Sequence, residues 1–144
     1  ACLVGSEMCI RDRYKTMLEN AKNDEDNELV EFIADQVDVF RKYVNSVVEM
    51  EIRIPVARFR METEDFQRFA ERLDTNRRKI HERAIDSCRI LNRLCDKMGL
   101  EALYPGDLED RYQVADFCLE IVSELFRDGQ HLDIQELAAK GEYI

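Results

Sequence analysis

Apolar residues between Glu62 and Gly99 recur mostly at steps of three, four or seven, the spacing of one face of an α-helix. Thr63 is a suitable N-cap, and Gly99 stands where a left-handed residue ends a helix, with Leu100 able to pack back on the last turn. We therefore expect a helix over residues 63–98, about 50 Å long at 1.5 Å per residue, that organises the chain. Its apolar positions are Phe66, Phe69, Leu73, Ile80, Ala84, Cys88, Leu91, Cys95 and Met98.

This pattern has one weak point, at Asn76 and Arg77, where an apolar residue is due and none occurs. The Asp, Thr and Asn residues just before Arg77 suit caps better than helix interiors. One continuous helix and two helices broken near Thr75 both fit the pattern, and we favour the continuous helix.

A second periodic stretch predicts a helix from Glu28 to about Arg53. Pro55 then disrupts the pattern, because proline lacks a backbone N–H and biases the preceding residue away from helix. Residues 55–61 fit a kinked continuation or a separate turn, and we favour the continuation. The stripe consists of Val30, Ile33, Val37, Phe40, Val44 and Val47.

A turn signal at Tyr104-Pro105-Gly106 precedes the last long periodic stretch. Asp107 is the expected N-cap of a helix from Leu108 to about Arg127. Residues 133–139 suggest one further short helix, with Leu132, Ile134 and Leu137 available for docking.

These elements predict an all-α fold, a three-helix up-down-up bundle with a long central helix and a short C-terminal helix. Residues 28–128 form the expected bundle, after a flexible lead-in at 14–27 and before a tail at 129–144. Charge supports this order, since residues 24–53 carry net −6, residues 63–98 net +2 and residues 107–128 net −5. A bundle of this order places the basic helix beside both acidic helices.

The first thirteen residues, ACLVGSEMCIRDR, resemble a translated sequencing-adapter remnant of metagenomic reading frames. On that resemblance we expect residues 1–13 to carry no biology.

Composition narrows the functional classes. A net charge of −10 argues against broad nucleic-acid binding and against adsorption to anionic membranes. No apolar run approaches the ~20 residues of a membrane span. The five cysteines include no CxxC pair, which favours a reducing cytoplasm.

His81, Cys88 and Cys95 follow one another at steps of seven on one helical face. Residues seven apart are about 10 Å apart along a helix axis, too far for all three to bind one zinc. We expect the cysteines to be small core residues and His81 to lie at the edge of the interface.

Two acidic pairs, Glu28 with Glu31 and Glu71 with Asp74, loosely resemble those that bind magnesium in all-α nucleotide pyrophosphohydrolases. Such pairs arise by chance in so acidic a chain, and no basic substrate clamp accompanies them.

Arg77, Arg78 and Lys79, with Arg72 and Arg83, form a basic cluster. This cluster suits a phosphate or an acidic partner, but we favour pairing with acids on the neighbouring helices.

From about Val44 to Phe126 the chain resembles a small all-α bacterial family of unknown function. That resemblance implies helices and a bacterial, mobile-element setting, and it brings no activity. The matching segments are Val47-Val48-Glu49-Met50-Glu51, Arg58-Phe59-Arg60-Met61, Ile90-Leu91-Asn92-Arg93-Leu94-Cys95, Glu109-Asp110-Arg111 and Ala115-Asp116-Phe117. Among them, Asn92-Arg93 and Glu109-Asp110-Arg111 are expected to meet near the turn between the last two helices, in a structural role.

We interpret the chain as a cytoplasmic bundle that acts through protein–protein contact, with an unknown protein partner or as a homodimer. The alternative is a metal-dependent nucleotide phosphohydrolase. We assign no catalytic, cofactor-binding or metal residues, and we favour a non-enzymatic role. The enzyme needs three acids converging on one concave site, whereas the interaction protein needs an exposed apolar patch.

Overall fold

The computed structural model describes residues 9–125, and this part of the chain contains helices and no strands. The four helices are α1 (Ile10–Asn23), α2 (Asn27–Arg60), α3 (Thr63–Lys97) and α4 (Arg111–Leu125). The all-α class is therefore confirmed. None of these helices is both long and apolar enough to cross a membrane.

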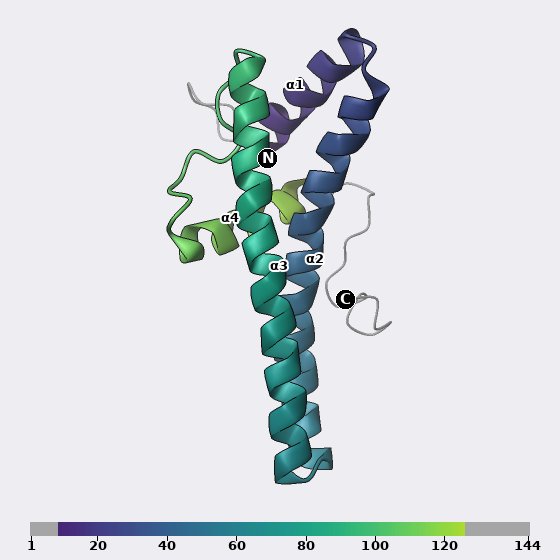
Figure 1. The fold of residues 1–144 in the computed structure, drawn as a ribbon, viewed down its shortest axis with the longest axis vertical. Helices are drawn as coiled ribbons and strands as arrows, with labels where there is room; N and C mark the ends of the chain where they lie inside the picture. Colours follow the sequence, from purple (N-terminus) through teal and green to yellow (C-terminus); the bar gives the residue numbers. More distant parts are fainter. Residues whose placement is uncertain (1–8, 126–144) are drawn as a thin grey trace.

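The two longest helices, α2 and α3, form an antiparallel hairpin that closes at Met61 and Glu62 (Figure 1). Their 34 and 35 residues correspond to about 51 and 52 Å, so the two helices accompany each other along almost their whole length. The continuous helix through Thr75 is confirmed. The continuation beyond Pro55 is confirmed too, because α2 runs through it to Arg60.

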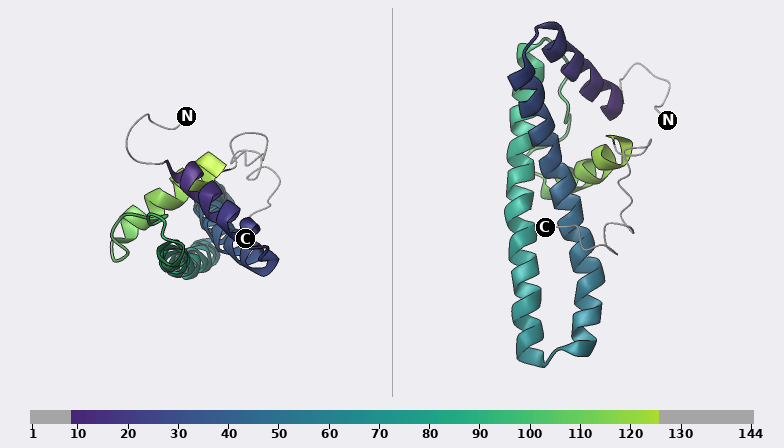
Figure 2. Two further views of the ribbon diagram at one scale, coloured as in Figure 1. Left: turned by 90° about the horizontal axis from the view of Figure 1, so that it is seen from above. Right: turned by 90° about the vertical axis from the view of Figure 1, so that its right-hand side faces the viewer.

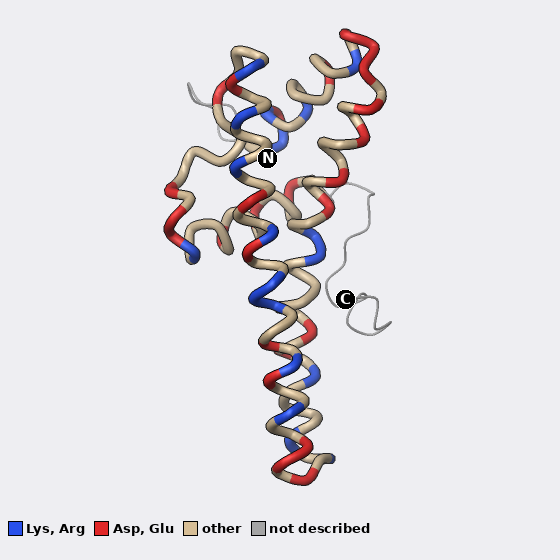
Figure 3. The backbone as a smooth tube through the Cα atoms, viewed as in Figure 1, with Lys and Arg blue, Asp and Glu red and all other residues tan. Residues whose placement is uncertain are grey.

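At the open end of the hairpin, α1 and α4 cover its surface, and α4 lies obliquely across the α2–α3 pair (Figure 2). Contacts of α4 with α1, α2 and α3 agree with a helical bundle. Figure 3 shows acids concentrated on the first half of α2, with basic residues interspersed along α3.

Helix α1 differs from the expected flexible lead-in at residues 14–27. Met17 and Ala21 are fully buried in the main core, and Ile10 is also buried. Tyr14 and Leu18 pack against the same core. The expectation was wrong because these apolar positions, separated by polar residues, follow helical spacing over only three turns.

Three helix ends show which capping signals were correct. Gly99 adopts φ +73°, and the Leu100 N–H donates to the Cys95 carbonyl oxygen at 2.8 Å, as expected for a left-handed helix stop. Thr63 is the first residue of α3 rather than its N-cap, which is Glu62. The last helix begins at Arg111 rather than Leu108, because Asp110 Oδ1, not Asp107, accepts from the first backbone N–H groups.

Buried apolar side chains fall into two clusters. The main core lies at the open end of the hairpin, where all four helices contribute. A small distal cluster lies toward the closed end and contains Ala57, Phe69 and Leu73, with Met50, Ile54 and Phe66 partly buried around them. The expected short helix at 133–139 and the tail at 129–144 lie outside the described residues.

Candidate functional site

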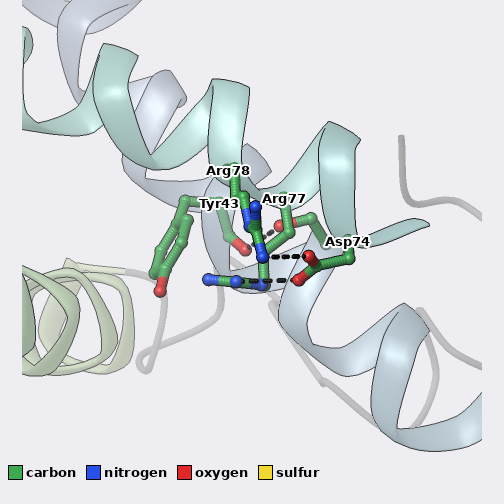
Figure 4. A network of polar contacts seen from close by, with 5 residues as sticks. Tyr43, Asp74, Arg77 and Arg78 are labelled. Atoms are coloured by element: carbon green, nitrogen blue, oxygen red, sulfur yellow. Dashed lines mark hydrogen bonds and ion pairs between the residues drawn. The ribbon is translucent and has the colours of Figure 1, made fainter. Parts of the chain in front are cut away.

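A polar layer separates the two apolar clusters midway along the hairpin (Figure 4). Asp74 accepts from Arg77 at 2.9 Å and pairs with Arg78 at 2.8 Å. Arg77 also lies beside the Tyr43 side chain across the hairpin, and its hydrogen bond to Asp74 raises its pKa. The layer occupies the place where the apolar pattern of α3 lapses at Asn76 and Arg77.

His81 joins this layer to the beginning of α4. Its ring lies 4.7 Å from the Tyr43 ring, and its Nε2 donates to the Arg111 carbonyl oxygen at 3.1 Å. Burial lowers the pKa of His81, and the positive charges of Arg111 and Arg77 act in the same direction, while the hydrogen bond to the Arg111 carbonyl oxygen opposes them. An ion pair between Glu82 and Arg111 makes a second link between α3 and α4. His81 is therefore a buried connecting residue, with an exposed fraction of only 7%.

Arginine side chains cover the distal cluster. Arg53 lies over the Phe69 ring at 5.1 Å and Arg72 over the same ring at 5.8 Å. Arg58 lies over the Phe66 ring at 5.3 Å. These guanidinium groups keep water contact while their stems shield a cluster too small to exclude water by itself.

One face of α2 in this distal half remains apolar and uncovered. Ile52, Val56 and Phe59 stand at positions i, i+4 and i+7, so they form a single line on the helix. Their exposed fractions are 42%, 47% and 94%. We call these three residues the distal stripe.

The distal stripe points away from α3. Ala57, one residue beyond Val56, packs with Phe69 and Leu73 of α3, and this contact fixes the rotation of α2. Exposed apolar residues aligned on one face form a candidate interaction surface. The helical spacing of these three residues is visible in the sequence, but the same helix has a second apolar face. Spacing alone does not tell which of the two faces packs in the core and which is exposed.

Cys88 and Cys95 are core residues, as expected. Cys88, Cys95 and Cys118 are free and buried. Burial raises the pKa of Cys88 to about 12 and also raises the pKa of Cys95 and Cys118. These thiols are therefore held protonated and poorly nucleophilic.

The acidic pairs do not form a metal site with their neighbours. Asp74, a member of the second pair, is engaged by two arginines, Arg77 and Arg78. Within residues 9–125, no three His, Cys, Asp or Glu side chains come together in an arrangement that could hold a metal ion.

The ion pairs of the basic cluster differ from those expected. Arg77 and Arg78 pair with Asp74 of their own helix rather than with acids of α2 or α4. The reason is that Asp74 lies three and four residues before them, within direct reach on the same helical face. Arg83 lines a shallow, open depression of about 310 Å³ between α2 and α3, beside Asp35 and Asp86.

Asn92 has the structural role expected for it. Its Nδ2 donates to the Tyr104 carbonyl oxygen at 2.8 Å, and its Oδ1 accepts from the Tyr104 N–H at 2.9 Å. These two bonds hold the connection between α3 and α4 against α3. Arg111 reaches Glu82 instead of this connection.

Comparison with known proteins adds a family and no activity. Neither the curated proteins nor the solved structures contain a match. A family model described as a protein of unknown function (DUF3232) matches residues 3–131, which include the 44–126 segment whose motifs suggested a family of unknown function. The chain therefore belongs to the DUF3232 family of proteins of unknown function.

Proposed function

We propose that this protein acts through contact with another protein, and that the distal stripe of α2 is the centre of the contact surface. The observation that carries the proposal is the 94% exposure of Phe59, in line with Ile52 and Val56. Aromatic side chains near the centre of an interface contribute most of the binding energy when a partner buries them.

The surroundings of the stripe suit such a contact. Arg53 and Arg60 flank it, and arginine is enriched at protein interfaces. A stable interface buries about 800 Å² on each partner, so the flanking arginines would form the polar rim around the apolar centre.

Site-specific photo-crosslinking tests this proposal. A photoreactive amino acid replaces Phe59 in one variant and Tyr112 in a control, since Tyr112 on α4 is also largely exposed, at 84%. We expect defined crosslinked products that are larger than the chain itself, and therefore contain a second protein, from position 59 alone, and their loss when Ile52→Ser and Val56→Ser are added. The same products from both positions, or none from position 59, would overturn the proposal.

Self-association, through this or another surface, is a separate prediction. Light scattering over a wide range of protein concentration should give the mass of a dimer. A monomer mass at every concentration would contradict the homodimer and would leave a contact with a different protein as the proposed function.

A further inference from the structure

The distal stripe lies in the most basic part of α2. Residues 52–61 contain Arg53, Arg58 and Arg60 and no acid, in a chain whose net charge is −10. Arg53 and Arg60 lie on the same flank of the stripe, seven residues apart. Arg53 already forms an ion pair with Glu49, so Arg60 on this flank and Arg58 on the other carry most of the positive charge that a ligand would meet. The ligand that fits this surface is a segment with a few apolar side chains and an acidic flank.

The chain itself contains a segment of this chemistry. Residues 128–142 carry four acids and one lysine, together with Leu132, Ile134 and Leu137. They lie outside the described residues. Apolar groups and negative charge in this segment are the complements of the stripe and its basic flank.

The length of the chain permits the contact. Phe117 of α4 packs on Phe40 of α2, with ring centroids 5.6 Å apart. Ile52 is then about 18 Å along α2 from Phe40, and Leu125 is about 12 Å along α4 from Phe117. With the helix axes about 10 Å apart, Leu125 is within about 40 Å of Ile52 and about 50 Å of Phe59 whichever way α4 points. Residues 126–142 span about 56 Å when extended, which is enough to reach Phe59.

Building on the contact surface of the proposed function, we propose that residues 128–142 dock on the distal stripe of the same molecule. The C-terminal segment then covers Phe59 in the isolated protein, and a protein partner has to displace it. The segment acts as an intramolecular competitor that sets the affinity for the partner.

A second copy fits this surface less well. In an antiparallel two-fold contact the same flank of each helix meets, so Arg53 would face the partner copy's Arg60. In a parallel contact the helices would also meet along Asn45 and Glu49, which continue the line of the stripe and are already buried. Neither the antiparallel nor the parallel arrangement therefore gives the stripe a favourable contact with a second copy.

Tryptophan fluorescence tests the docking in the full chain. The protein contains no tryptophan, so Phe59→Trp introduces a single reporter on the stripe, and Tyr112→Trp introduces a matched one on α4. We expect Phe59→Trp to emit at a shorter wavelength than Tyr112→Trp and to be quenched severalfold less by acrylamide. Adding Leu132→Ser and Leu137→Ser should remove both differences and leave Tyr112→Trp unchanged.

A second pair of substitutions tests the charge. Asp133→Asn combined with Glu136→Gln should weaken the protection of the Phe59→Trp reporter from acrylamide. The dependence of that protection on salt concentration should also decrease, and the circular dichroism spectrum should stay unchanged. Equal quenching of the Phe59→Trp and Tyr112→Trp reporters in the otherwise unaltered chain would overturn the docking. Protection that disappears on dilution would overturn the same-molecule form and assign the segment to a second copy.

Different experiments test the partner contact and the docked segment, so either proposal can be refuted without the other. Fluorescence reads only the coverage of the stripe and needs no partner, whereas crosslinking reads the partner. Crosslinked products from position 59, combined with a fully exposed reporter in Phe59→Trp, would retain the contact surface and discard the docked segment. A protected reporter in Phe59→Trp without such products would retain the docking and discard the partner contact.

Discussion

The distal cluster should open without the rest of the protein when Leu73 is replaced by Ala. Leu73 is 8% exposed, and only Ala57 and Phe69 are buried beside it. Burial of one large apolar side chain contributes about 1.5–3 kcal/mol, so Phe69 and Leu73 together contribute about 3–6 kcal/mol to this half of the hairpin. A buried Leu→Ala change costs about 2–5 kcal/mol, which is a large part of that total.

Native-state hydrogen exchange measures this opening. A loss of about 3 kcal/mol corresponds to exchange more than about 100-fold faster, and we expect it for amides of residues 50–60 and 63–73. Amides of α1 and α4 should change much less, because the polar layer of Tyr43, Asp74 and Arg77 ends the distal cluster.

Leu91→Ala is the matched control. Leu91 is fully buried in the main core, so its removal should speed exchange in all four helices. If Leu73→Ala accelerates exchange in α1 and α4 by the same factor as in the distal hairpin, the two clusters form one cooperative unit and the reasoning is wrong.

Four further predictions concern individual residues in and near the main core. The lowered pKa of His81 means that folding favours its neutral form, so this contribution to stability is complete above about pH 6.5 and is lost as the pH falls toward the folded-state pKa. The loss of melting temperature between pH 7.5 and pH 5 should therefore be smaller in His81→Gln, and an equal loss would refute the assignment. Gly99→Ala should cost about 1–2 kcal/mol in denaturant unfolding from its positive φ alone, since nothing lies within 4 Å of an added Cβ. Gly106→Ala would place a Cβ 2.6 Å from the Tyr104 hydroxyl and should therefore shift the Tyr104 ring. This shift should change the near-ultraviolet circular dichroism spectrum, whereas Gly99→Ala should leave that spectrum unchanged. Cys88 and Cys118 should resist alkylation at pH 8 until the protein unfolds, and peptide mass spectrometry of the native protein would contradict this by finding both labelled.

Helical periodicity was sufficient for the two long helices because five or more turns repeat the same face. It also located the polar layer as a gap, although not the pairing of Arg77 with Asp74 and Tyr43. The helical ends were harder, since Asp107 and Asp110 are equally good N-caps by residue type and only the path of the connection selects Asp110.

The elements missed or left open depend on packing between distant segments. Helix α1 has few apolar positions, and Met17 and Ala21 become core residues only because α2 and α4 lie beside them. The distal stripe has the same spacing as a core face. Its exposure follows from the contact of Ala57 with Phe69 and Leu73, which no local pattern specifies.

The polar layer also fixes the alignment of the two long helices. A hairpin whose seam were apolar throughout could slide by one heptad, about 10 Å, and bury nearly the same area. With the layer present, such a slide would separate the buried Tyr43 from Arg77, its polar neighbour across the seam, and burial of a polar group without a partner is costly. A few polar residues therefore select one register, and with it the position at which the stripe stands on the outer face of the hairpin.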